Sequence, residues 1–262
     1  MAKREPLMTD QYFDEHIALR EKTVREWQDE MLQYKNKDAA QFSVFQYCMH
    51  LVPAYYSRGN SIFEIKNKFL AALEAWETLK QIDVDKQFVN SLKNGLNDYV
   101  NSIGLLSQAY LLDMEPVIIA RLLACIGSEG QDLLFEQLVA QIAPALVRKS
   151  AKKLLYPKVY QLLYDALNAS ADQQSVLVQQ FLKDWYKGIK VVGWHNSHKG
   201  PGGGGFFGYW CWEAAGVAHA FGIDDSSFHD MPYYPKDLAD FGQAAGKAAD
   251  TLRQSPRRTA DA

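Results

Sequence analysis

Apolar positions recur at helical spacing along most of this chain, with charged positions between them. In the first segment they fall three to five residues apart, which predicts an amphipathic helix capped by Thr9 and running to about Lys35. Ser61 and Glu64 have the spacing of a capping box, and apolar residues follow at helical steps as far as Leu79. The pattern therefore predicts helices from the start of the chain.

Extended to the whole sequence, the pattern predicts an all-α fold, because alternating β-branched runs bounded by turn residues are absent. Four long helices are expected first, and they indicate a bundle. Shorter helices follow, one of them capped by Asp172 and two beginning at Pro116 and Pro235. The expected ranges are 9–35, 39–56 (kinked or ended near Pro53), 61–79, 85–110 (opened by Asp85 and including Phe88), 115–127, 131–143, 157–169, 172–188, 207–221 and 235–252.

This order of elements predicts two modules. An N-terminal four-helix bundle-like module over residues 1–114 is expected to pack on a C-terminal helical module over residues 115–252. Residues 253–262 lack large apolar side chains and are expected to form a flexible tail.

Composition changes this picture little. The chain has 262 residues, 48% of them hydrophobic, so it can bury a sizeable core without help from metals or disulfides. Three cysteines, Cys48, Cys125 and Cys211, stand far apart in apolar runs, which predicts free thiols and a reducing compartment. The sequence shows neither a secretory signal nor an apolar run long enough to span a membrane. We therefore expect a cytoplasmic protein without a membrane partner.

Charge is unevenly distributed, although the formal net charge is only −3. Residues 148–199 carry nine Lys or Arg against three acids, and residues 205–250 carry seven acids against two Lys. The basic cluster suggests a nucleic-acid footprint, but a solvated helix face is the commoner origin of such a cluster in a chain without net positive charge. The acidic segment is distinguished by the aromatic residues mixed into it.

Candidate sites for chemistry are weak. The glycine-rich run from Gly200 to Gly205 lacks the lysine and preceding strand of a phosphate-binding loop, which favours a connector. His195 and His198 stand three residues apart but match no strong zinc spacing. Asp224 and Asp225 form an adjacent pair, for which turn and capping chemistry is the ordinary role. No nucleophile–base spacing is present, so we expect no catalysis, no cofactor and no resident metal.

One ordered series of short motifs occupies about 32 residues near the C-terminus. It consists of Phe207-Gly-Tyr-Trp, Glu213-Ala-Ala, Gly222-Ile-Asp-Asp-Ser-Ser and Pro232-Tyr-Tyr-Pro-Lys-Asp-Leu. This series resembles the C-terminal module of the PoNi family, the immunity proteins of polymorphic nuclease toxins. The N-terminal half is compatible with the other module of that family, and the glycine-rich run before the motifs is longer than the resemblance leads us to expect.

The resemblance implies a mainly helical cytoplasmic protein that binds a cognate DNase toxin and neutralises it. Such toxins are delivered between bacteria, often by a type VI secretion system. An inhibitor of a DNase gains from carboxylates that occupy the places of phosphates, and from buried aromatic anchors. The expected contact set combines both residue types: Asp224, Asp225, Phe228, Asp230, Tyr233, Tyr234 and Asp237.

Three alternatives remain open from the residues alone. In the first, the same motif residues serve chiefly to close the C-terminal helices on one another, because stability and recognition use the same residue types. A nucleic-acid-binding module would use the basic cluster at 148–199, and a metal-dependent enzyme would use His195 and His198 with nearby carboxylates. The sequence leaves the oligomeric state undetermined.

Overall fold

The computed structural model of the chain describes residues 2–33, 35–83, 85–86 and 91–254. Within these ranges it contains ten α-helices, three short 3-10 helices and no strand, which confirms the all-α prediction. The α-helices are α1 (Asp10–Glu30), α2 (Lys37–Arg58), α3 (Ile62–Ile82), α4 (Leu96–Leu111), α5 (Pro116–Ile126), α6 (Leu133–Ile142), α7 (Pro157–Ala166), α8 (Ala171–Gly188), α9 (Trp212–Phe221) and α10 (Lys236–Gln254). None of the described helices is both long and apolar enough to cross a membrane.

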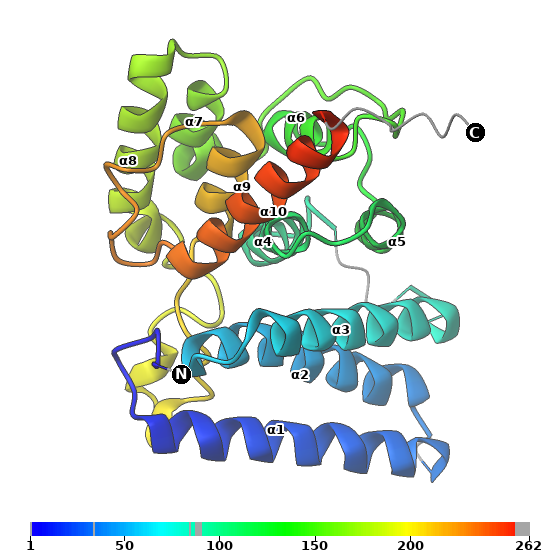
Figure 1. Cartoon of the computed structure of the whole chain (residues 1–262). Coiled ribbons are helices and arrows are strands. Elements are labelled where there is room, and N and C mark those ends of the chain that lie inside the picture. Colours follow the sequence, from blue (N-terminus) through cyan, green and yellow to red (C-terminus); the bar gives the residue numbers. More distant parts are fainter. Residues whose placement is uncertain (1, 34, 84, 87–90, 255–262) are drawn as a thin grey trace, which may run out of the picture.

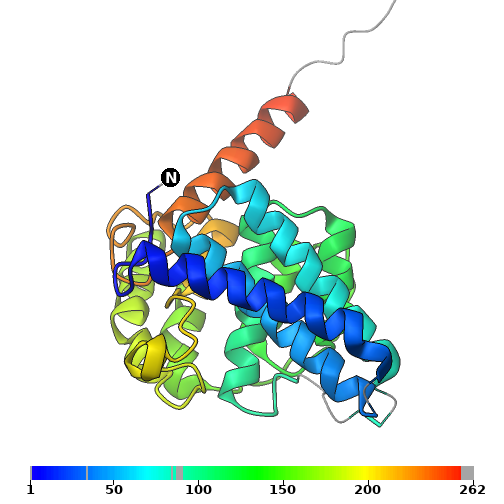
Figure 2. The ribbon, with the colours of Figure 1, turned by 90° about the horizontal axis from the view of Figure 1, so that it is seen from below.

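The helices form two bodies. α1, α2 and α3 lie side by side as one layer, and α4 to α10 gather in a second body that packs on the α3 side of this layer (Figure 1). Seen from below, the C-terminal part of α10 projects beyond the rest of the molecule (Figure 2). The expected two-module arrangement is therefore confirmed.

The fourth of the expected bundle helices differs in its partners. α4 packs chiefly against α9, and also against α5 and α10, so it belongs to the core of the second body. Every residue from Ser102 to Ala109 is buried, and this stretch carries no charged side chain. A helix that is buried on all sides lies inside a domain, whereas the α1–α3 helices expose a polar face. The N-terminal layer thus holds three helices, and α5 of the second body contacts it at α3.

Two helix starts predicted from a local cap, at Thr9 and Ser61, are confirmed. The hydroxyl of Thr9 accepts a hydrogen bond from the Tyr12 N–H at 3.1 Å, and Ser61 and Glu64 form a reciprocal capping box. Pro53 lies inside α2, which continues unbroken to Arg58.

Three predicted starts were wrong. The fourth helix begins at Leu96 instead of Asp85, because turns and a bend occupy residues 92–94 and Gly95 has a φ of +148°; Phe88 lies outside the described residues. Ser170 is the N-cap residue of α8, and Asp172 sits in its first turn. Residues 207–211 precede α9 as non-helical chain, in which Gly208 has a φ of +109°. The tail from residue 255 onward also lies outside the described residues.

An N-terminal strap, residues 2–9, ties the two bodies together. The N–H groups of Arg4 and Glu5 both donate to the Ser57 carbonyl at the end of α2. The buried Glu5 carboxylate accepts from the Tyr209 N–H at 3.2 Å, and the Arg4 guanidinium pairs with Asp237 on α10 at 2.5 Å. Tyr209 and Asp237 lie more than 200 positions from the strap in the chain. The strap therefore fixes the position of the start of the fold relative to its end.

Candidate functional site

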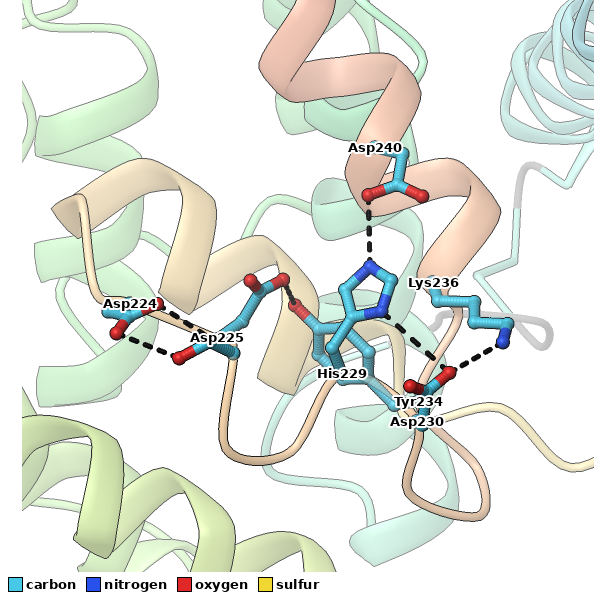
Figure 3. A network of polar contacts seen from close by, with 8 residues as sticks. Asp224, Asp225, His229, Asp230, Tyr234, Lys236 and Asp240 are labelled. Carbon is cyan, nitrogen blue, oxygen red and sulfur yellow. Dashed lines mark hydrogen bonds and ion pairs between the residues drawn. The ribbon is translucent and has the colours of Figure 1, made fainter.

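The loop between α9 and α10, residues 222–235, carries most of the expected contact residues. It begins at Gly222, whose φ of +65° ends α9 in a left-handed C-cap. Asp224 accepts hydrogen bonds from the N–H and hydroxyl of Ser226, at 3.1 and 2.9 Å, and these bonds lower the pKa of its carboxyl group. The turn chemistry expected for this acidic pair is therefore present at Asp224 (Figure 3).

Asp225 is hydrogen-bonded to one of the two buried aromatic residues of the loop. Its carboxylate accepts a hydrogen bond from the Tyr234 hydroxyl at 2.8 Å, and the Tyr234 ring meets Phe228 edge-on with centroids 5.3 Å apart. Both rings are buried, Phe228 at 1% and Tyr234 at 3% exposure. These two members of the expected contact set pack inside the loop and support its shape, so their side chains are not presented on the surface.

The other carboxylates of the loop region each have a cationic or imidazole partner. Asp230 pairs with Lys236 at 2.6 Å, which lowers the pKa of the aspartate, and His229 contacts Asp240 at 2.9 Å (Figure 3). The pair between Asp237 and Arg4 adds one positive charge from outside the acidic segment, whereas Lys236 was already included in its charge count. The Asp230 side chain nevertheless remains 82% exposed and is accessible to a partner.

Tyr233 stands at the edge of the loop in an unusual backbone conformation. Its φ is +71°, a region that non-glycine residues seldom adopt. The half-buried ring stacks on Tyr186 with centroids 5.1 Å apart and an interplanar angle of 13°. Two contacts hold Tyr233 in this strained backbone conformation: the stacking on Tyr186, and the hydrogen bond from the Cys211 N–H to the Tyr233 carbonyl.

A groove of about 570 Å³ separates the loop from the N-terminal strap. One wall is the strap, and the other is formed by residues 230–237 with Tyr209 and Trp210 behind them. The groove thus brings together two pieces of the motif series and a segment from the opposite end of the chain. Sequence reasoning missed the strap, because nothing in its short Lys-Arg-Glu-Pro run indicates contacts more than 200 residues away.

Glu213, which begins the second piece of the motif series, lies in the core of the second body. It is 1% exposed in the first turn of α9, where one carboxylate oxygen accepts from the Tyr160 hydroxyl at 2.9 Å and the Trp185 indole at 2.7 Å. Burial raises the pKa of Glu213 to about 7. This carboxyl group joins α7, α8 and α9 in the core of the second body.

The basic cluster at 148–199 is divided among several elements. Arg148 forms a bidentate pair with Glu136 of α6, with its Nε at 2.8 Å. The lysines that follow lie on the loop before α7, on α7, on α8 and after it. One of them, Lys183, donates to the neighbouring Gln179 side chain.

The histidines and cysteines considered for metal binding have other contacts. His195 stacks on Tyr186 at 4.3 Å, and the His198 ring contacts the Tyr209 hydroxyl at 2.7 Å. The described residues contain no group of three or more His, Cys, Asp or Glu that could hold a metal ion. Three free, buried thiols confirm the expected absence of disulfides, and burial raises the pKa of Cys211 well above its ordinary value.

Comparison with known proteins bears on both the fold and the family. No curated protein sequence matches this chain. Among solved structures, the crystal structure of protein PA2201 from Pseudomonas aeruginosa superposes with a TM-score of 0.72 at 16% identity, covering 94% of this chain and 92% of that one. This similarity supports the helical architecture.

Two sequence models of one family match successive parts of the chain. The model of the N-terminal part of PoNe immunity proteins matches residues 4–124, and the model of the C-terminal part matches residues 130–238. The second match ends at Leu238 and so includes the whole motif series and the loop that borders the groove. With both halves matched in order, the chain belongs to the PoNe immunity protein (PoNi) family.

Proposed function

We propose that this protein acts in the cytoplasm as a non-catalytic inhibitor that binds a cognate PoNe nuclease toxin, as part of interbacterial competition by type VI secretion.

 The family match over both halves of the chain carries this proposal, because immunity to PoNe toxins is what the family is named for. A nuclease must present a positively charged surface to the phosphates of DNA, and an acidic partner competes for that surface.

The proposed contact surface is the exposed side of the loop at 222–235 together with the groove beside it. Asp224 and Asp230 are exposed and supply negative charge, while Asp225 and Asp237 lie partly accessible behind them. Tyr233 supplies an aromatic edge of the kind that concentrates binding energy at interfaces. Phe228 and Tyr234 contribute indirectly, by holding the loop in shape.

The direct test uses a purified PoNe nuclease toxin, and the products of neighbouring reading frames are the first candidates to try. We expect the purified protein to form a stable complex with that nuclease and to abolish its DNA cleavage once the two are equimolar. The protein alone should leave DNA intact in the presence of magnesium. Undiminished cleavage at a large excess of this protein, with no complex in size-exclusion chromatography, would refute the proposed function.

Charge reversal at Asp224 and Asp230 should slow association with the toxin. Both side chains lie on the surface and hold only local contacts, so an Asp224→Lys/Asp230→Lys variant should keep its helical circular dichroism signal. We expect the association rate to fall roughly tenfold or more at low salt and the difference to shrink as salt rises. Stopped-flow or surface plasmon resonance measurements at two salt concentrations would show this.

A matched control places the same charges elsewhere. Asp165 and Asp184 are exposed, and each accepts a hydrogen bond from a glutamine one helical turn away. Asp165→Lys/Asp184→Lys should therefore change the net charge equally while association stays closer to that of the unmodified protein. Equal rates for the two double variants, with melting temperatures that show both to be folded, would remove this loop from the contact surface.

A further inference from the structure

One face of α1 meets the glycine-rich segment that the sequence left without a role. Tyr12, His16 and Arg20 follow one another at four-residue steps and so share this face. The Tyr12 hydroxyl donates to the Phe206 carbonyl at 2.8 Å, which anchors the segment after Gly205 against α1. Figure 1 shows this yellow segment beside the N-terminal half of α1.

Arg20 lies in this corner without a counter-charge. Its guanidinium stacks over the Tyr47 ring, 4.6 Å from the centroid, and its Nε is buried without an acceptor. Within the described residues it makes neither a hydrogen bond nor an ion pair. A guanidinium has five N–H donors, and its strongest hydrogen bonds go to carboxylate or phosphate oxygens, which the described residues do not supply to Arg20.

The histidines around Arg20 add no positive charge near pH 7. His16 is 8% exposed, and its Nε2 is buried without a hydrogen-bond partner. Burial, followed by the charge of Arg20, lowers the pKa of His16 to about 4. His50 stacks on Phe207 with centroids 4.6 Å apart, and its pKa falls to about 3 for the same two reasons. Both imidazoles are therefore neutral near pH 7, and Arg20 is the charged centre of the corner.

The backbone of Gly205 lies against the Arg20 guanidinium. A Cβ at this position would lie 2.8 Å from the Arg20 Nη2, so any larger residue would press on that nitrogen. The φ of Gly205 is +76°, and its N–H donates no hydrogen bond among the described residues. A glycine backbone close to a cation is a recurring arrangement at anion sites, because its N–H groups can approach the ligand.

We propose that Arg20, His16 and the backbone at Gly205 form a binding site for a small oxyanion of the phosphate or carboxylate class. The oxyanion supplies the missing acceptor for the guanidinium, and the Nε2 of His16 provides a second polar contact one helical turn away. The site is separate from the groove and the loop at 222–235, so it does not depend on the proposed toxin contact.

The test measures thermal unfolding with sodium phosphate, sodium acetate and sodium chloride at equal ionic strength. We expect phosphate or acetate at tens of millimolar to raise the melting temperature beyond the chloride control, and the comparison of the two identifies the oxyanion class. The Arg20→Gln variant should lose this protection. Arg25→Gln, an exposed arginine on the same helix, should retain it. Equal shifts in chloride, or equal protection of both variants, would overturn the proposal.

A second readout follows the imidazole of His16 by nuclear magnetic resonance. A bound anion beside it should raise its pKa from about 4, in the unmodified protein and in Arg25→Gln only. If Arg20→Gln does not fold, Arg20→Lys is the replacement variant, because lysine keeps the charge and most of the aliphatic chain but lacks the planar guanidinium. Arg20→Lys should bind the anion roughly tenfold more weakly or worse. An anion affinity unchanged in Arg20→Lys, with no change in the His16 titration, would also contradict the proposal.

Discussion

Replacing Gly208 by alanine should destabilise the protein by about 2–5 kcal/mol. A positive φ costs an L-residue about 1–2 kcal/mol. Overpacking by the new methyl group adds about 1–3 kcal/mol. The φ of Gly208 is +109°, and a Cβ there would lie 2.0 Å from the Ser57 Oγ and 2.5 Å from the Trp210 Nε1. These two atoms are themselves hydrogen-bonded at 2.8 Å, so neither can move without breaking a contact between the two bodies.

Chemical denaturation of Gly208→Ala and of a second glycine variant would measure this effect. Gly222 also has a positive φ, +65°, but no atom lies within 4 Å of the position of its Cβ. Gly222→Ala should therefore cost only about 1–2 kcal/mol, the cost of the backbone alone. Equal free energies of unfolding for the two variants would mean that the crowding around Gly208 relaxes freely, contrary to this expectation.

The different environments of these two glycines show what the motif series encodes. Gly208 allows the chain to pass close to the end of α2, and Glu213 joins three helices in the core of the second body. Tyr234 is buried against Phe228. Several residues that make the family recognisable in the sequence therefore maintain the fold. The proposed contacts fall on their more exposed neighbours, such as Asp224 and Asp230.

Local signals in the sequence predicted local structure well. The caps at Thr9 and Ser61 depend on residues three positions apart, and both were correct. The start of α4 was misplaced by 11 residues, from Asp85 to Leu96, because apolar periodicity alone does not show where turns replace the first helical turns. The non-helical chain before α9 was missed because it is held by hydrogen bonds to Ser57, far away in the sequence.

The candidate site was predictable only in part. The acidic residues were visible in the sequence, but the pairing of Asp237 with Arg4 joins positions 233 residues apart. The groove also depends on contacts between distant parts of the chain, because one of its walls is the strap and the other is the loop. Charge counting along the chain cannot reveal such partners, and it therefore overestimated the free negative charge of this surface.

The stability of the protein should depend on pH through Glu213. Its pKa is about 7 in the folded protein and near the ordinary value of 4.5 when unfolded. Between these values the folded state holds a proton that the unfolded state has released. The free energy of unfolding should therefore fall as pH rises from about 4.5 to 7, by about 3 kcal/mol at 1.36 kcal/mol per pH unit.

The Glu213→Gln variant isolates this contribution, because an amide has nearly the same shape and does not titrate in this range. Its carbonyl oxygen can accept from Tyr160 and Trp185 as the carboxyl group does. We expect the two proteins to differ in unfolding free energy by a constant amount below pH 4.5. Between pH 4.5 and 7 the difference should shift by about 3 kcal/mol in favour of Glu213→Gln.

Other groups titrate over the same range but are common to both proteins. Burial raises the pKa of Glu5 and lowers those of His16 and His50, so their effects cancel when the two denaturation series are subtracted. A Tyr160→Phe variant removes a hydrogen bond that lowers the pKa of Glu213, and it should extend the loss of stability to higher pH. Parallel pH profiles for the unmodified protein and Glu213→Gln would show instead that Glu213 is ionised in the folded core, with the charge stabilised by Tyr160 and Trp185.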